Sequence, residues 1–471
     1  MKNDEILNGK VGILLFKLSF PAAAGMIACS ALDLIDTFFI SKLGSEALAA
    51  LTISLPIQNL IISIVSATGT GITSGIARAL GSNRVEHADN IAWHGIFISL
   101  IYGIIFGLLV NRYIDDILVI LGTPVQTFYL VREYMLIILW ACVFSFIPMT
   151  IGNIIQGEGD TLWSIIITLI AMGINVLLDP FFIFGLKGIN GMGLNGAAVA
   201  AVLSQAVSCI LVIILMKRRR KRFLTWSFRH FHPSIKVLLN IYKVGLPAII
   251  MEISGVITMT CFTRLLGGYS STAVAASGVF LRIRALVFMP VYGLAQGSMP
   301  IASFAYGAGN LPRVRETIMK ASFYVLFYMI LCWFLLQFYP NPLMRLFADD
   351  PSLFILGVTC VKLGTIFIPA VGVFLILVTI MQAVGKGTMA MSLYLTKQIC
   401  LMLPLLLMLP HFYGLNGVWL VFSVADIISA FLAAIFFLKL WRELQEGRKT
   451  GIIVFLRWNY ILKRFWAWIK N

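Results

Sequence analysis

The chain has 471 residues, of which 60% are hydrophobic and only 12% are charged. Soluble domains hold roughly 45–50% apolar and about 25% charged residues, so a water-soluble fold is excluded. The formal net charge of +16 does not indicate a nucleic-acid partner, because the Lys and Arg residues stand between hydrophobic stretches instead of forming one basic face. Membrane lipids are the expected surroundings of this chain.

Apolar stretches long enough to cross a bilayer as helices, about 20 residues each, recur along the whole chain. The basic run KRRRKR at 217–222 directly follows the sixth stretch and is typical of a cytoplasmic loop. Alternation from this loop places both termini in the cytoplasm, and the loops left outside are poor in Lys and Arg. The predicted fold class is an all-α integral membrane protein with about twelve transmembrane helices. The predicted spans are 13–40, 47–77, 91–110, 129–156, 162–184, 196–216, 240–264, 272–303, 319–339, 354–383, 389–410 and 417–440.

The two halves of the sequence repeat at a constant offset. Pro21 matches Pro247, an offset of 226 (247 − 21), and later the tetrapeptide GLNG recurs from Gly193 to Gly414 with the offset reduced to 221. Six spans per half is an even number, so the two six-helix lobes are predicted to be parallel repeats about an axis along the membrane normal. Such lobes enclose a cleft, which is a plan suited to transport. The offset of 226 also pairs Gly81 with Gly307, Gln156 with Gln382 and Gly159 with Gly385.

Charge and hydropathy divide the chain into four parts. The last 21 residues, GIIVFLRWNYILKRFWAWIKN, mix aromatic and basic residues and predict an amphipathic helix on the cytoplasmic leaflet. Membrane anchoring is the simpler interpretation of this tail, with a regulatory or partner-binding role as the alternative. The predicted parts are an N-terminal lobe at 1–216, a basic cytoplasmic linker at 217–239, a C-terminal lobe at 240–440 and the tail at 441–471.

Carboxylates inside spans are candidates for function, because burying one at mid-helix costs about 2.5–3.5 kcal/mol. Asp36 and Asp179 lie at similar distances from the outer ends of two spans with the same direction, so they could face each other. Asn175 shares a helix face with Asp179, and Pro180 can free backbone carbonyls. These residues predict a proton or cation site, where one carboxyl group holds a proton unless Na⁺ neutralises the pair. Alternatively, each Asp only hydrogen-bonds a neighbouring helix.

Further intramembrane polar residues have no partner that the sequence can name. Asp33 precedes Asp36 by one helical turn and could support it, whereas Glu252 and Asp426 are either ligands of substrate or ion, or structural carboxylates. Nearby arginines either neutralise these acids or extend toward the membrane surface. The basic candidates are Arg264 and Arg284, and the minor candidates are Lys397 and Gln156.

Motifs for enzymatic chemistry are missing from the sequence. It contains no GxxxxGK[ST] loop for ATP hydrolysis and neither HExxH nor GxSxG for a hydrolase. The protein is therefore predicted not to be an enzyme, to need no cofactor and to use an ion gradient, with H⁺ or Na⁺ as the coupling ion.

Two spans carry motifs that are typical of one transporter family. The first span has an acid followed by an apolar run and Leu-Gly at 36–44, and the fifth has Asn-x-x-x-Asp-Pro in NVLLDPFFIF at 175–184. With these motifs the sequence resembles the multidrug and toxic compound extrusion (MATE) family. The twin GLNG segments and the segments QGEGDT and QAVGKGT extend the resemblance over residues 13–440.

This resemblance implies a two-lobed transporter that exports amphipathic, often cationic compounds in exchange for H⁺ or Na⁺. Asp36, Asn175 and Asp179 match the N-lobe cation site of the family, which also makes them the candidate Na⁺ ligands. Glu252 resembles an acid of one branch. The sequence departs from the family at Ala201, where many relatives have a hydroxyl residue, and residues 371–400 lack an acid. These departures favour H⁺ over Na⁺.

The location predicted for such a transporter is the bacterial cytoplasmic or plasma membrane, where it would act as a monomer. A flippase for lipid-linked oligosaccharides or lipids has a similar architecture and is the alternative function. It would require several cationic side chains in the cleft, and only Arg264, Arg284 and Lys397 qualify. A membrane-embedded enzyme is the third hypothesis, and no metal or nucleophile cluster supports it.

Overall fold

Helices form nearly all of the protein in the computed structural model, which describes residues 3–120, 123–186, 189–219, 224–345 and 351–446. Two short strands, β1 (Gly185–Leu186) and β2 (Ile189–Asn190), pair in an antiparallel hairpin after the fifth span. The all-α prediction is confirmed for the membrane-crossing part of the chain.

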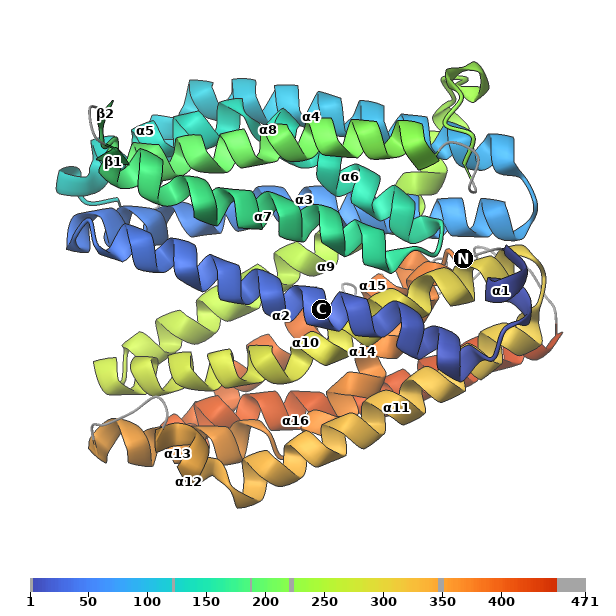
Figure 1. Ribbon diagram of the computed structural model, residues 1–471. Helices are drawn as coiled ribbons and strands as arrows, with labels where there is room; N and C mark the ends of the chain where they lie inside the picture. The colour runs from blue at the N-terminus through green and yellow to red at the C-terminus, as the bar shows by residue number, and fades with distance from the viewer. Residues whose placement is uncertain (1–2, 121–122, 187–188, 220–223, 346–350, 447–471) are drawn as a thin grey trace, which may run out of the picture.

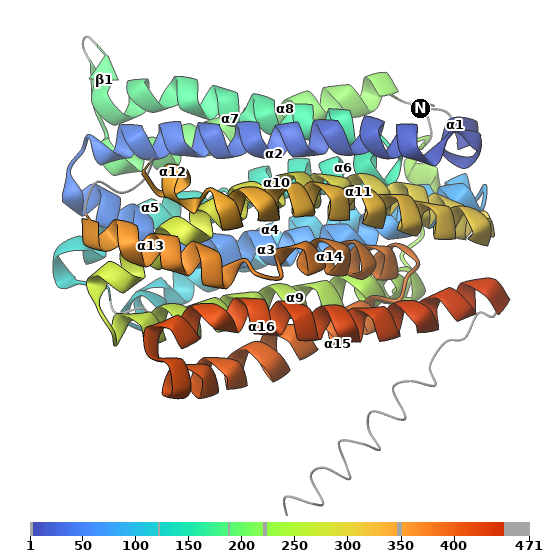
Figure 2. The same ribbon diagram turned by 90° about the horizontal axis from the view of Figure 1, so that it is seen from below.

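Twelve crossings can be followed through the described residues. Nine helices are long and apolar enough to span a bilayer, and two more spans are helix pairs bent by 51° and 53°. The twelfth arises because the helical stretch Gly387–Gln445 reverses at Gly414, whose backbone is not helical. Figure 2 shows this reversal within the element labelled α16 (Leu403–Glu446). The helices are α1 (Asn3–Asn8), α2 (Val11–Ser41), α3 (Ser45–Gly81), α4 (Val85–Ile120), α5 (Val125–Trp140), α6 (Cys142–Gly157), α7 (Thr161–Phe184), α8 (Gly193–Arg219), η1 (Phe228–His230), α9 (Ile235–Gly267), α10 (Ser271–Gly307), α11 (Leu311–Phe338), α12 (Pro340–Arg345), α13 (Pro351–Gly364), α14 (Ile368–Ala383), α15 (Gly387–Leu395), η2 (Thr396–Met402) and α16 (Leu403–Glu446).

Two lobes are stacked in Figure 1, with α3–α8 above, α9–α16 below and α2 between them. The helices are longer than the apolar spans predict: α4 covers Val85–Ile120 where the hydrophobic window covers only 91–110. Backbone hydrogen bonding continues past the last apolar residue, so polar residues extend a helix into water. For the same reason α9 already begins at Ile235, within the predicted linker.

Equivalent turns in the two lobes reproduce the sequence repeat at the level of the backbone. Gly159 and Gly385, 226 positions apart, have φ values of +79° and +78°. The next residue donates to the carbonyl five positions earlier in both turns, Asp160 to Ile155 and Lys386 to Met381. This is the glycine-terminated end of a helix in which a left-handed residue lets the chain leave the axis.

The lobes touch at one end of the molecule, called here the closed end, which carries the turns 82–84 and 308–310. Arg78 of α3 donates from Nη1 to the carbonyl of Ala383 over 3.0 Å, and Gln156 of α6 donates to the carbonyl of Gln296 over 3.2 Å. Glycines make this contact close: a Cβ on Gly81 would lie 2.2 Å from the Phe304 carbonyl oxygen, and one on Gly307 would lie 2.1 Å from that of Arg78.

The first helix also joins the lobes at the closed end. The Ile6 side chain is fully buried among hydrophobic residues of the N-lobe core. Arg313, on α11 of the other lobe, donates to the carbonyls of Ile6 and Gly9 over 2.9 and 2.7 Å. The short helix α1 is thus held by both halves of the chain.

The segment that connects the two lobes, described from residue 224 on, is hydrogen-bonded to the first turns of α4. The backbone N–H groups of Thr225 and Trp226 donate to Oδ1 of the fully buried Asp89 over 3.0 and 3.2 Å. Ser234 N–H donates to Nε2 of His94 over 3.1 Å. The first part of the basic run at 217–222 continues α8, and the rest of it lies outside the described residues, as do residues 447–471 of the predicted tail.

Candidate functional site

Two acids predicted to face each other lie side by side in the N-lobe. Asp36 projects from α2 and Asp179 from α7, and each carboxyl group is an electrostatic neighbour of the other. Asp179 is fully buried, and Asn175 Nδ2, one turn earlier on α7, donates to its Oδ1 over 3.0 Å. The helix continues through Pro180 to Phe184. Asp36, Asn175 and Asp179 therefore form one cluster.

Two further polar side chains complete this N-lobe cluster, and the sequence did not single them out. Tyr134 of α5 is 5% exposed, has both acids among its electrostatic neighbours, and its hydroxyl lies in hydrogen-bonding reach of Gln58 on α3. Gln58 in turn donates to the Ser54 hydroxyl over 3.0 Å. A glutamine within an apolar span is itself a signal of function, because its amide must find partners away from water.

Asp36 and Asp179 have no basic partner among the described residues. The ion pairs found in this lobe involve other acids, such as Asp115, which binds Arg132 over 2.6 Å at the surface. Asp33 is exposed and its carboxyl group acts on Asp36 only as a neighbouring negative charge. Two carboxylates without a counter-ion in a low-dielectric site cannot both stay ionised, so the arrangement can take up a proton or a small cation. Within the described residues, no group of three or more His, Cys, Asp or Glu could hold a metal ion.

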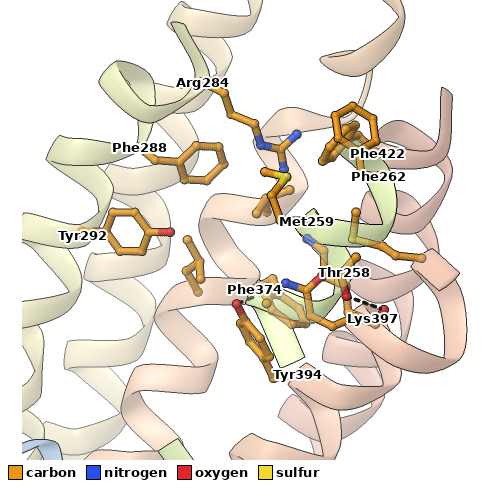
Figure 3. Close-up of a pocket in the computed structure, with 15 residues that line it drawn as sticks. Thr258, Met259, Phe262, Arg284, Phe288, Tyr292, Phe374, Tyr394, Lys397 and Phe422 are labelled. Atoms are coloured by element: carbon orange, nitrogen blue, oxygen red, sulfur yellow. Dashed lines mark hydrogen bonds between the residues drawn. The ribbon is translucent and has the colours of Figure 1, made fainter. Parts of the chain in front are cut away.

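A partly open cavity of about 220 Å³ lies within the C-lobe, lined by α9, α10, α14, α15, η2 and α16. Six of its fifteen lining residues are aromatic. Figure 3 shows the Arg284 guanidinium between the rings of Phe288 and Phe422. The residues that line the cavity are Gly255, Thr258, Met259, Phe262, Arg284, Phe288, Tyr292, Val371, Phe374, Leu375, Tyr394, Lys397, Gln398, Met402 and Phe422.

Three charged residues meet at this C-lobe cavity. Asp426 of α16 is 1% exposed; its Oδ1 lies 2.8 Å from Lys397 Nζ and its Oδ2 lies 3.6 Å from Arg284 Nη2. Lys397 belongs to η2, a wide turn in which helical hydrogen bonds skip one residue more than in an α-helix. Such a turn changes the rotation of all following side chains about the helix axis, and it sets the direction of Lys397.

The remaining predicted residues lie apart from these two clusters. Glu252 is exposed on α9, with Tyr292 and Tyr394 as electrostatic neighbours, and forms no ion pair within the part of the chain that the structure describes. Arg264 is exposed near the end of α9, and in the described part of the chain the ion-pair partners of Asp426 are Arg284 and Lys397 instead. Gln156 contributes to the contact at the closed end and not to either cluster.

The N-lobe cluster and the C-lobe cavity occupy related positions in the repeat. The offset of 226 carries Asp36 onto Phe262 and Gln58 onto Arg284, and both of these C-lobe residues line the cavity. An acid is thus replaced by an aromatic ring and a neutral amide by a guanidinium. The two sites share a frame but not their charge.

Membrane-crossing helices in two repeated lobes, with polar sites inside each lobe, define the class of this protein as a multi-pass membrane protein. The family model described as MatE matches residues 21–181 and 247–407, which together make up more than half of the chain and start 226 residues apart. The chain belongs to the MatE family, so it is a transport protein and not an enzyme.

Individual relatives extend this similarity over nearly the whole chain. A FAD transporter of Shewanella oneidensis is 25% identical over 90% of this chain and 93% of its own length. The multidrug export protein MepA of Staphylococcus haemolyticus is 24% identical over 96% of this chain and 100% of its own. Among solved structures, the outward-facing conformation of a multidrug resistance MATE family transporter of the MOP superfamily has a TM-score of 0.87 and 24% identity, covering 96% of this chain and 99% of that one.

Proposed function

We propose that the protein is a secondary active exporter that exchanges H⁺ for amphipathic, often cationic compounds. The observation that carries this proposal is the pair of facing carboxyl groups, Asp36 and Asp179, in the interior of the N-lobe. Two such acids without a basic partner take up one positive charge more easily than they keep two negative ones. The multidrug export protein among the relatives supports a drug-like substrate.

Transport would proceed by alternating access of the two lobes. The positive-inside pattern assigns the closed end to the cytoplasm, so we take the state described above, whose lobes touch at that end, as the outward-open one. A proton that enters from outside and binds at Asp36 and Asp179 removes negative charge from the site, which changes the relative stability of the outward-open and inward-open states. The released drug leaves on the outer side, and both termini remain cytoplasmic.

Na⁺ is the alternative coupling ion. The carboxylates of Asp36 and Asp179 and the amide oxygen of Asn175 are oxygen donors of the type that hard cations prefer. Asn175 already uses its Nδ2 for Asp179, which leaves its Oδ1 free to turn toward an ion. Among the described residues, the one further carboxylate close to the pair is that of Asp33, which is exposed and makes no hydrogen bond to either acid, and this favours H⁺.

The test is dye efflux from vesicles that contain the purified protein, with a pH gradient and a Na⁺ gradient imposed separately. We expect efflux to follow the pH gradient and to fall to the level of empty vesicles in Asp36→Asn and in Asp179→Asn. The matched control is Asp116→Asn, an exposed acid at the end of α4 in the same lobe. Unchanged pH-driven efflux in both site variants would overturn the proposal, and efflux that follows only Na⁺ would assign the other ion.

A flippase for lipid-linked substrates remains the second candidate because the C-lobe cavity does carry the cations Arg284 and Lys397. Complementation of a flippase-deficient strain without dye efflux would favour it. A monomer in the bacterial cytoplasmic membrane is the expected form under either function, since each lobe holds its polar cluster within one chain.

A further inference from the structure

The wall of the C-lobe cavity carries two basic side chains and no acidic one. The two basic residues are Arg284 and Lys397. The carboxylate behind them, Asp426, lies 2.8 Å from Lys397 Nζ but 3.6 Å from the nearer Arg284 nitrogen. One carboxylate thus neutralises one of the two cations, and Lys397 is the better paired.

Arg284 has donors that the described residues leave unused. Its Nη1 is buried and has no hydrogen-bond acceptor in the described part of the chain. A buried donor without an acceptor destabilises the folded state, and a charged donor does so more strongly. An anion that entered the cavity would supply both the acceptor and the missing negative charge.

The wall around Arg284 favours a flat, aromatic molecule. The guanidinium carbon lies 4.8 Å from the ring centre of Phe422 and 5.2 Å from that of Phe288, while Lys397 Nζ lies 4.9 Å from that of Phe374. The rings keep both cations at fixed positions and offer faces and edges for stacking. A small inorganic anion would leave these aromatic surfaces unused.

The size of the cavity limits the ligand further. A cavity of roughly 150 Å³ lined by apolar side chains holds benzene, and this one measures about 220 Å³. It therefore accommodates one or two fused rings with a compact charged group. The other titratable groups nearby are the neutral phenols of Tyr292 and Tyr394 and the carboxyl group of Glu252, which belongs to α9 but not to the wall.

We propose that the C-lobe cavity is a binding site for small aromatic anions, such as one- or two-ring aromatic carboxylates, with Arg284 as the residue that binds the anionic group. The ring lies among Phe288, Phe374 and Phe422, and Lys397 stays paired with Asp426. This site goes beyond the proposed function, because the N-lobe exchange of protons for cationic compounds assigns no role to an anion. The two proposals can fail independently, since one concerns binding in the C-lobe and the other coupling in the N-lobe.

The test measures calorimetric binding of 1-naphthoate to the purified full-length protein in lipid nanodiscs, beside the cationic analogue 1-naphthylmethylammonium. We expect saturable binding of the anion, at least tenfold tighter than of the cation, and a loss of about tenfold or more in Arg284→Gln. Arg284 is the surplus cation, so this variant leaves the pair of Lys397 and Asp426 intact. Arg282→Gln is the matched control, since Arg282 lies two residues away on the exposed side of α10.

A second measurement on the unaltered protein guards against a folding defect in the variant. Bound 1-naphthoate is expected to raise the Tm of the wild-type protein, whereas 1-naphthylmethylammonium is not. No saturable binding of the anion, equal binding in Arg284→Gln, or a preference for the cation would each overturn the proposal and leave Arg284, Asp426 and Lys397 as a purely structural charge cluster.

Discussion

In the N-lobe, Asp36 and Asp179 face each other with no basic side chain from the described residues beside them, whereas in the C-lobe Asp426 lies between Lys397 and Arg284. Both arrangements sit on the same repeated frame. The negative charge of the N-lobe pair has no positive side chain from the described residues beside it. In the C-lobe, the carboxylate of Asp426 is balanced by basic side chains of the same lobe. A duplicated backbone can therefore host an acidic cluster in one lobe and a cluster with two basic side chains in the other.

The largest expected effect concerns transport through the N-lobe acids. If Asp36 and Asp179 bind one proton as a unit, Asp36→Asn, Asp179→Asn and the double variant should all reduce pH-driven dye efflux to background, with no further loss in the double. Glu252→Gln in the C-lobe should keep the dependence on the pH gradient. Partial losses of efflux in the two single variants that add up in the double variant would show that the two acids act independently, which contradicts the prediction.

The same type of substitution should act on stability in the C-lobe. Asp426→Asn leaves the buried Lys397 and the partly buried Arg284 without their carboxylate partner, and we expect it to lower the free energy of unfolding by about 3–5 kcal/mol. Asp179→Asn should lower it by less than about 1 kcal/mol, because an amide replaces a carboxyl group that has no cation partner. Chemical unfolding followed by circular dichroism in detergent checks both values.

A second substitution sharpens this stability prediction. Adding Lys397→Met to Asp426→Asn removes one of the stranded cations and should recover part of the lost free energy. No recovery in the double variant would mean that Asp426 stabilises the lobe through something other than its charge.

A smaller effect, equal in the two lobes, is expected at the closed end. Gly81→Ala and Gly307→Ala each place a methyl group against a backbone carbonyl of the other lobe, which should disfavour the closed contact by about 1–3 kcal/mol. Gly278→Ala is the control, because a Cβ there meets open space. Cross-linking of engineered cysteine pairs across the closed end should drop in the first two variants only; unequal drops would show that the contact is not symmetric.

The smallest effect is expected at the turns that the repeat shares. Gly385→Ala forces an L-residue into a φ of +78° and should cost about 1–2 kcal/mol of stability. Gly159→Ala should cost more, because its Cβ would also lie 2.5 Å from Ile6 Cδ1. Thermal unfolding of both variants checks this order, and a larger loss at Gly385 would contradict it.

The sequence predicts the crossings and the pairing of the acids, because both follow from helix rise alone. Asp36 and Asp179 could be matched since their distances from the span ends fix their depth. Tyr134 and Gln58 were missed because joining the same cluster also depends on the rotation of α5 and α3 about their axes, which packing between lobes and helices decides.

The sequence did not predict the ion pairs of the C-lobe either. Arg284, Lys397 and Asp426 were all candidates, but the wide turn η2 changes the direction of Lys397 in a way that a regular period of 3.6 residues does not foresee. The depth of these side chains in the membrane could be predicted from the sequence, but the direction in which each points from its helix axis could not.

The contact of Arg313 with Ile6 and Gly9 has a consequence for the order of events during synthesis. The guanidinium that binds these carbonyls belongs to a residue 307 positions later than Ile6. At roughly 5–20 residues per second, the carbonyls wait for tens of seconds before this partner exists. The contact between α1 and α11 therefore forms only after part of the second half of the chain has been made.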